Sequence, residues 1–217
     1  MSVVTPAAIK DLRERTGAPM GDCKKALEES GGDVAKAIEF LQKKSMASAA
    51  KKASRIAAEG RVGAYVHHDG KTAVLIEVNC ESDFVALTDD FKEIVSSLCL
   101  QIAAMSPRWV RKDEISEGDL AKQREIFEAQ VRELGKPEAL VPKIAEGKLN
   151  AWYGDTVLLE QSYVKDDKLT VGKWLAERVG KIGENIVVRR FTRYELGEGI
   201  EKRQDDFVAE VARMAQA

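Results

Sequence analysis

The stretch Val78-Asn-Cys-Glu-Ser-Asp-Phe-Val-Ala-Leu87 lies where a strand-like pattern changes into a helical one. The residues before it, 73–78, form a short run rich in β-branched side chains, as is typical of a strand. The residues after it, 89–105, carry apolar side chains at helical spacing. The stretch is therefore predicted to be a strand-to-helix turn, and the rest of the chain can be placed relative to it.

Two explanations fit the residues of this turn. Its polar side chains, Asn79, Glu81, Ser82 and Asp83, can satisfy the free amides at a helix start. In the first explanation Asp83 caps the helix and Phe84 folds back as a core or staple residue. In the second, Phe84 points outward as a wedge for a partner protein. Local chemistry alone favours the first explanation.

The composition indicates a chain that can fold but names no partner. It has 217 residues, of which 44% are hydrophobic, enough for a real core. Its 34 basic and 36 acidic residues leave a net charge of -2, so no overall basic field favours nucleic acid. We see no signal peptide and no uninterrupted apolar run of the ~18 residues that a membrane span needs. We therefore expect a soluble cytoplasmic protein that binds neither membranes nor nucleic acid directly.

The sequence offers no metal, cofactor or catalytic site. Cys23, Cys80 and Cys99 are scattered and lack metal-ligand spacing, which indicates reduced thiols. His67 and His68 are adjacent, and in a strand they would point to opposite faces. We find no nucleophile elbow, Walker A loop, dinucleotide fingerprint, zinc spacing or HExxH motif. These absences favour a binding or regulatory protein.

The predicted fold class is α+β, with four parts along the chain. Residues 1–43 predict a bundle of three short helices, and residues 44–60 predict a linker helix. Residues 61–200 predict a core in which a small antiparallel sheet packs with helices, including a helical hairpin. Residues 201–217 predict a C-terminal helical module.

Local signals support the first two parts. Thr5 followed by proline is a helix-start signature, Gly31-Gly32 closes the second helix, and Asp33 caps the third. Residues 44–60 are rich in alanine and basic side chains. Such a run could bind phosphate, but it lacks interleaved aromatic residues, so a solvated linker face is favoured.

The strands of the core follow from alternation and turn residues. Residues 61–68 and 71–78 are separated by Asp69-Gly70, a strong hairpin signal. Residues 186–194 predict a further strand. Simple alternation along it places Ile186, Val188 and Arg190 on one face, and Val187, Arg189 and Phe191 on the other.

Helical spacing predicts the remaining core elements. Residues 116–134 and apolar positions within 140–149 predict an antiparallel helical hairpin. Residues 155–164 look strand-like, and residues 170–180 predict a helix capped by Thr170.

Four segments closely resemble motifs of bacterial translation elongation factor Ts, and they occur in the order of that family. They are Asp11-Leu-Arg-Glu-Arg-Thr-Gly-Ala-Pro-Met20, Asp22-Cys-Lys-Lys-Ala-Leu27, Glu77-Val-Asn-Cys-Glu-Ser-Asp-Phe-Val85 and Gly197-Glu-Gly-Ile-Glu-Lys202. Because the match covers the bundle, the core and the carboxyl end, the chain is identified as a member of this family. Its length resembles the short form, which has a single core unit.

The resemblance implies a guanine nucleotide exchange factor for elongation factor Tu, the GTPase that carries aminoacyl-tRNA to the ribosome. It also implies that the bundle is similar to a ubiquitin-associated (UBA-like) domain that docks on the nucleotide-binding domain of Tu. Arg13 and Met20 stand at matching contact positions. Gly21 stands where members commonly have an apolar residue, which removes contact area.

The turn acquires a role from the same resemblance. Ser82, Asp83, Phe84 and Val85 match a family motif, usually Thr-Asp-Phe-Val, whose phenylalanine intrudes near the magnesium and phosphate end of the Tu site. Ser82 keeps the hydroxyl of threonine and loses a methyl group. Context thus favours the outward-pointing Phe84, whereas Asp83 suits both capping and partner contact.

The resemblance further implies that the carboxyl helix contacts a different domain of Tu, through Phe207, Val208 and Val211. Short members of the family pair two chains, so we expect a homodimer bound to two Tu molecules. No catalytic residue and no cofactor of its own are implied. The rival hypotheses are an adaptor whose bundle binds another protein, such as a ubiquitin-like fold, and a small acyl-transfer or hydrolytic enzyme.

Overall fold

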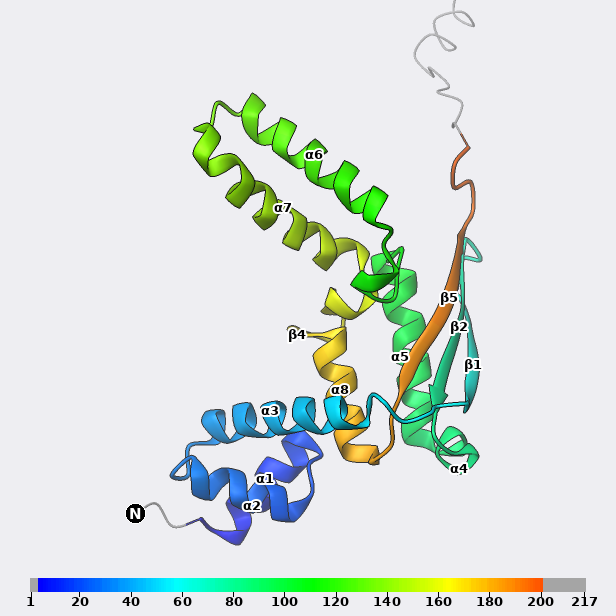
Figure 1. Ribbon diagram of the computed structural model, residues 1–217. Coiled ribbons are helices and arrows are strands. Elements are labelled where there is room, and N and C mark those ends of the chain that lie inside the picture. Colours follow the sequence, from blue (N-terminus) through cyan, green and yellow to red (C-terminus); the bar gives the residue numbers. More distant parts are fainter. Residues whose placement is uncertain (1–3, 201–217) are drawn as a thin grey trace, which may run out of the picture.

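The computed structural model describes residues 4–200, which combine helices with a small antiparallel sheet. Figure 1 shows three parts: a bundle at the amino terminus, a sheet covered on one face by a long helix, and a helical hairpin that projects from the far end of that helix. The predicted α+β class is confirmed. Every helix within residues 4–200 is too short or too polar to span a lipid bilayer.

The bundle consists of α1 (Pro6–Thr16), α2 (Met20–Glu29) and the first half of α3 (Val34–Lys52). The predicted caps are confirmed: the Thr5 hydroxyl accepts a hydrogen bond from the Ala8 amide, and the Asp33 carboxylate accepts from the amides of Ala35 and Lys36. Six side chains form a separate small core: Leu12, Cys23, Ala26, Leu27, Ala37 and Leu41.

α3 continues through residue 43 without interruption, so the third bundle helix and the start of the expected linker helix are one helix of 19 residues. The helix ends at Lys52, and the first strand begins at Glu59. The second half of α3 packs on α8 (Val171–Ile182). A continuous helix held at both ends joins the bundle to the core more stiffly than a free linker would.

The sheet contains β1 (Glu59–Val66), β2 (Thr72–Cys80) and β5 (Val187–Glu195), in the antiparallel order β1-β2-β5. The predicted hairpin is confirmed. The hydrogen bond of 2.8 Å from the His67 amide to the Thr72 carbonyl closes it, so its loop is longer than the Asp69-Gly70 pair. One face of the sheet packs on α5 (Asp89–Met105). The strand side chains buried in this core are Val74, Ile76, Val78, Cys80 and Val188.

A bulge in β5 overturns the predicted alternation. Val78 pairs with Val188 and Glu77 pairs with Arg190, so Arg189 is an extra residue between them. Val188 and Phe191 therefore lie on the same core-facing side. The bulge places Arg189 and Arg190 beside Glu77. The Glu77 carboxylate forms ion pairs with both, at 3.2 Å and 2.7 Å.

The predicted helical hairpin is confirmed as α6 (Glu117–Glu133) and α7 (Val141–Thr156), which pack together (Figure 1). Short 3-10 turns lie at Lys112–Glu114 before it and at Glu138–Leu140 between its helices. Buried glutamines hold its base. The Gln161 amide group donates to the carbonyls of Met105 and Asp155, and Gln101 donates to Gln161 at 3.2 Å.

The strand predicted over residues 155–164 is wrong for most of its length. α7 runs to Thr156, a 3-10 turn occupies Leu158–Glu160, and only Ser162–Tyr163 (β3) pairs with β4 (Asp166–Thr170). Val157, Leu158 and Tyr163 of this run are buried where the hairpin joins the core, so the apolar pattern reflects burial and not strand alternation. α8 begins at its predicted cap, Thr170, and continues past Gly180 to Ile182.

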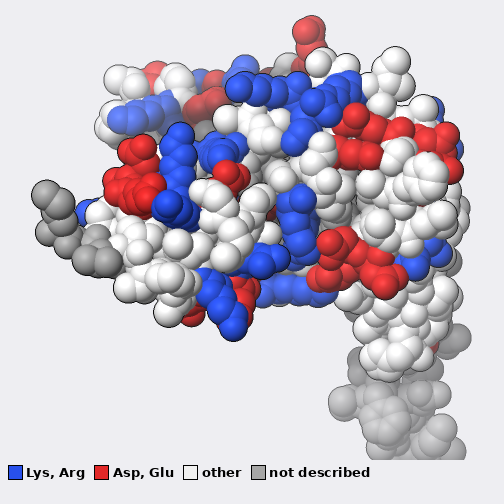
Figure 2. All heavy atoms as spheres, turned by 90° about the horizontal axis from the view of Figure 1, so that it is seen from below, with Lys and Arg blue, Asp and Glu red and all other residues white. Residues whose placement is uncertain are grey.

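Charged side chains of both signs share the face of the molecule seen in Figure 2. Figure 2 shows basic and acidic groups interspersed over the face seen from below, with uncharged surface between them. On this face the mixture offers no broad basic strip for a phosphate backbone.

Candidate partner-binding site

The turn after β2 contains a one-turn helix, α4 (Asp83–Leu87), which leads directly into α5. Ser82 is the N-cap of α4, since its hydroxyl accepts a hydrogen bond from the Val85 amide at 3.4 Å. Asp83 is the first residue inside the helix, and its carboxylate accepts from the Phe84 amide at 2.8 Å. The explanation in which Asp83 caps the helix is therefore wrong, because the serine before it takes that place.

Phe84 does not belong to the core. Its side chain is 79% exposed, and Leu87, three residues later on the same side of the helical turn, is also exposed. Ala86 is buried and Val85 packs partly against the core, so α4 rests on the sheet with its other side. The core or staple explanation for Phe84 is wrong, and α4 carries an apolar tip in solvent.

The carboxylates of Glu81 and Glu184, which lie far apart in the sequence, support this tip. The Glu184 carboxylate accepts hydrogen bonds from the amides of Glu81 and Ser82, at 3.1 and 3.0 Å, and from the Ser82 hydroxyl at 2.6 Å. In return, the Glu81 carboxylate accepts from the Asn185 amide at 2.6 Å and pairs with Arg55 at 3.3 Å. The hydrogen bond from the Asn185 amide and the charge of Arg55 lower the pKa of Glu81.

Sequence reasoning missed Glu184 and Asn185. They follow Gly183, whose left-handed backbone (φ 90°) ends α8 and directs the chain into β5. They lie more than a hundred positions from the turn that they contact. The polar pair between a helix end and a strand is the only local signal, and it does not identify a partner segment.

The predicted bundle contacts lie on a separate surface. Arg13 is exposed near the end of α1, and Met20 is the first residue of α2 with 49% of its side chain exposed. No atom lies within 4 Å of a Cβ built on Gly21, so an apolar residue would fit there. Arg13 and Met20 belong to α1 and α2 of the bundle and Phe84 to α4, and Figure 1 shows α8 between the bundle and α4.

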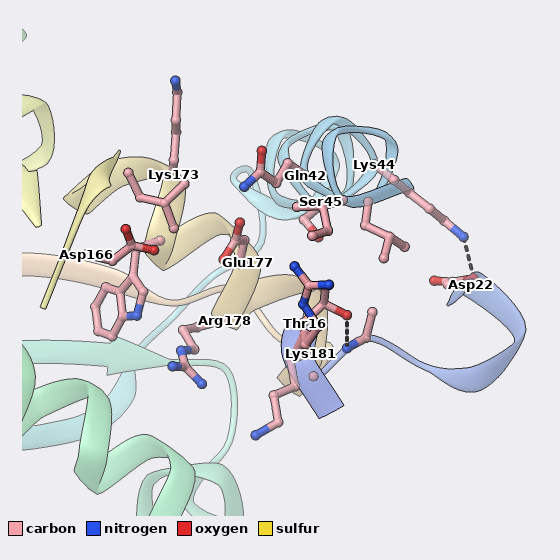
Figure 3. Close-up of a pocket in the computed structure, with 18 of the residues that line it drawn as sticks. Thr16, Asp22, Gln42, Lys44, Ser45, Asp166, Lys173, Glu177, Arg178 and Lys181 are labelled. Atoms are coloured by element: carbon pink, nitrogen blue, oxygen red, sulfur yellow. Dashed lines mark hydrogen bonds and ion pairs between the residues drawn. The ribbon is translucent and has the colours of Figure 1, made fainter. Parts of the chain in front are cut away.

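A cleft of about 930 Å³ separates the bundle from α8 (Figure 3). Glu177 of α8 and Gln42 of α3 point toward each other across its inner end. Burial raises the pKa of Glu177, although the hydrogen bond from Gln42 opposes this shift. An ion pair between Lys44 and Asp22 lies at its outer side. Among the charged side chains that line the cleft, Lys44 pairs with Asp22, and Lys181 pairs with Asp90 outside it.

The outer face of the sheet is apolar and is left exposed by residues 4–200. The register places side chains of all three strands on it, and Val62 and Leu75 at its centre are 68% and 52% exposed. The apolar residues of this face, called here the outer sheet patch, are Val62, Ala64, Val66, Ala73, Leu75 and Tyr194.

Within the described part of the chain, no group of three or more histidine, cysteine or acidic side chains could hold a metal ion. The three cysteines are buried. β1 ends at Val66, so His67 and His68 lie in the loop with ring centroids 4.3 Å apart, and the expectation that they face opposite sides is wrong. Phe207, Val208 and Val211 lie outside the described residues.

A family model described as Elongation factor TS matches residues 10–198. The chain is 52% identical over 217 residues to Elongation factor Ts of Desulforamulus reducens, with 100% of both chains covered. It is 54% identical over 215 residues to Elongation factor Ts of an Anaeromyxobacter species, covering 99% of this chain and 98% of the relative. It is 53% identical over 213 residues to that of Desulfitobacterium hafniense, covering 98% of each chain. The chain therefore belongs to the elongation factor Ts family.

Proposed function

We propose that this protein is a guanine nucleotide exchange factor that binds GDP-bound elongation factor Tu and promotes GDP release, so that GTP can reload. Membership of the elongation factor Ts family supports this function. The observation that carries it is Phe84, a large apolar side chain held in solvent at the end of the sheet. The factor acts by binding and not by covalent catalysis, and translation takes place in the cytoplasm, where we expect it to work.

An exchange factor must bind Tu in a form that holds GDP poorly. It can shift the nucleotide equilibrium of Tu only if it binds the GDP-free and GDP-bound states with different affinity. The effect is reciprocal: the factor weakens the binding of GDP to Tu as much as GDP weakens the binding of the factor. A coupling free energy of about 3 kcal/mol would weaken GDP binding ~100-fold. Tight binding to both states alike would release no nucleotide.

Phe84 is suited to act as the wedge that creates this difference. GDP in a GTPase pocket is held by loop amides and by magnesium, which neutralises the oxygen charge of the phosphates. An aromatic ring inserted beside these elements displaces them without needing a hydrogen-bond partner of its own. Burying the ring in Tu would also stabilise the complex by about 1.5–3 kcal/mol through the hydrophobic effect, because the ring is exposed to water in the free factor. Ser82, Asp83 and Val85 complete this magnesium-dislocating motif.

We assign docking on the nucleotide-binding domain of Tu to the UBA-like bundle, through Arg13 and Met20. Both side chains are exposed, as a contact surface requires. The C-terminal helix would reach another domain of Tu through Phe207, Val208 and Val211. This arrangement divides the chain into the bundle at 1–43, the linker at 44–60, the dimerisation core at 61–200 and the C-terminal module at 201–217.

We further propose a homodimer that binds two Tu molecules. The outer sheet patch suits a second copy of this chain, because two twisted sheets can pack face to face with their side chains interdigitated. A two-fold axis would bury the same apolar row on both chains, together with the ion-paired Glu77, which lies beside Val62 on the same face. A monomer would leave this row in water.

The direct test is stopped-flow mixing with Tu that carries fluorescent GDP. The exchange function predicts that GDP release accelerates with the concentration of this protein and reaches a plateau. An adaptor that binds a ubiquitin-like fold, or a small hydrolase, predicts release at the intrinsic rate of Tu. Release at that intrinsic rate, with the two proteins shown to be folded, would refute the proposed function.

A further inference from the structure

We infer that Glu184 is a positioning residue for nucleotide exchange, which holds the Phe84 tip in the orientation that enters the partner. This inference rests on the proposed function and deepens it. The observation behind it is a reciprocal clamp between residues 81–82 and residues 184–185. Each segment supplies one carboxylate to the backbone amides of the other.

The clamp acts on the cap of α4 through a single hydroxyl. Ser82 donates its hydroxyl proton to Glu184 at 2.6 Å, and the same oxygen accepts from the Val85 amide. A serine hydroxyl rotates freely until its proton finds an acceptor. Because the acceptor here is a carboxylate, the bond is charge-assisted, and it directs a lone pair of the oxygen at the helix amide. Glu184 therefore orients the cap, and the cap sets the first turn that carries Phe84.

The tip depends on this support because α4 is too short to hold itself. A helix of five residues is unstable without tertiary contacts, since nucleation fixes several dihedral angles for one hydrogen bond. The amides of Glu81 and Ser82 also follow the end of β2, beyond the ladder. Glu184 supplies their acceptors, and Cys80 adds a thiol hydrogen bond to the Ser82 carbonyl at 3.1 Å.

The clamp also contacts the segment that follows α3. The Asn185 side chain donates to the Arg55 carbonyl at 2.9 Å, and the Arg55 guanidinium pairs with Glu81. Arg55 lies three residues after the end of α3. The two parts assigned to contact Tu, the bundle and the Phe84 tip, are thus joined to one junction, whose geometry Glu184 and Glu81 determine together.

The test measures GDP release from Tu with the variant Glu184→Gln. The amide has the size of the carboxylate but lacks its charge, and its nitrogen cannot accept a hydrogen bond, so at least one of the three donors loses its partner. We expect the plateau rate of release to fall about tenfold, while the concentration at half-plateau changes less than threefold. The matched control is Glu160→Gln, which removes an exposed ion pair with Lys112 far from the clamp and should leave both values unchanged.

A double-mutant cycle with Phe84→Ala separates positioning from general destabilisation. If Glu184 acts through Phe84, Glu184→Gln should have little further effect on the plateau rate once the ring is gone. An equal fractional loss in both backgrounds would assign Glu184 a merely structural role and overturn the inference. If Phe84→Ala itself releases GDP normally, the wedge function fails. If only Glu184→Gln releases GDP normally, the clamp inference fails alone.

Ser82 provides a second route if Glu184→Gln does not fold. Ser82→Ala removes the hydroxyl and leaves the two backbone bonds to Glu184, so it should lower the plateau rate in the same way. Ser82→Thr keeps the hydroxyl and should retain the wild-type rate. Equal rates for Ser82→Ala and Ser82→Thr would contradict the role of the oriented cap.

Discussion

Gly180 on α8 lies directly against Ser45 on α3, so that a Cβ atom added to Gly180 would be 3.0 Å from the Ser45 hydroxyl oxygen. This close approach lets the two helices pack and fixes the bundle on the core. The contact lies beyond residue 43, in the segment expected to be a linker. The orientation of the bundle therefore depends on a seam between α3 and α8.

Gly180→Leu should force this seam apart. Overpacking of this kind costs about 1–3 kcal/mol, so we expect a lower unfolding midpoint and a larger hydrodynamic radius. The control is Gly147→Leu in α7, where nothing lies within 4 Å of an added Cβ. That change should stabilise the protein by up to about 1 kcal/mol, because leucine favours a helix more than glycine does. Thermal unfolding and small-angle scattering of both variants measure the difference, and equal behaviour would contradict the tight seam.

Phe84→Ala should leave the fold intact and slow exchange. An exposed side chain contributes within about 0.5 kcal/mol of stability, so the unfolding midpoint should barely move. We expect the stimulated release of GDP from Tu to fall about 10- to 100-fold, equivalent to about 1.4–2.7 kcal/mol of lost coupling. Leu134→Ala, which truncates another exposed apolar residue at the end of the hairpin, is the control and should exchange normally. Wild-type release by Phe84→Ala would refute the wedge.

Leu75→Lys should dissociate the proposed homodimer. The substitution places a charge in the middle of the outer sheet patch, where pairing would bury it without a partner. Light scattering should give twice the chain mass of 23.9 kDa for the wild type and the chain mass itself for the variant. Val164→Lys, at an exposed position in the turn between β3 and β4, should remain dimeric. A stable wild-type monomer at working concentration would sink the dimer proposal.

Glu177 should make stability depend on pH. Burial raises its pKa in the folded protein, so the folded state binds the proton more tightly than the unfolded state does. The contribution is fully present below the ordinary carboxyl pKa and is lost as pH rises through the folded pKa. Glu177→Gln should therefore flatten the stability profile in this window and raise the unfolding midpoint near neutral pH. Urea titrations across the window measure both effects, and an unchanged profile would contradict the assignment.

The cysteine thiols should resist modification until the protein opens. Burial raises the pKa of both Cys80 and Cys99 to about 11, so neither forms much thiolate at pH 8. A chromogenic disulfide reagent should react with native protein only as fast as it opens, and with all 3 cysteines in denaturant. Because Cys80 bonds to the clamped turn, Glu184→Gln should speed its labelling more than that of Cys99. Fast labelling of both thiols in the wild type would contradict their burial.

Local signals accounted for the element starts and for much of the element order. Thr5, Asp33 and Thr170 cap the helices that they were predicted to cap, because a cap forms with amides only two or three residues away. The hairpin, α5 and the helical hairpin follow from periodicities contained within single segments. The family motifs were recognised in the same way, from contiguous residues.

Local signals failed where partners are distant in sequence. Periodicity could not show that α3 continues past residue 43, because packing on α8 supports its second half. The strand pattern of 155–164 was misleading because burial at the hairpin base also selects apolar residues. The bulge at Arg189 reversed the expected faces because register depends on the neighbouring strand.

The sequence by itself determined the α+β class, the caps and the family of this protein, because these depend on short-range hydrogen bonds, periodic apolar residues and contiguous motifs. The family resemblance already favoured an outward-pointing Phe84, which the structure confirms, whereas only the tertiary structure decided that Ser82, not Asp83, is the cap. It also brought Glu184 to the turn across 102 positions of chain. The physical reason is that the hydrogen-bond donors of a carboxylate depend on which segments lie beside it in the fold. The local conformational propensity of neither segment specifies this contact.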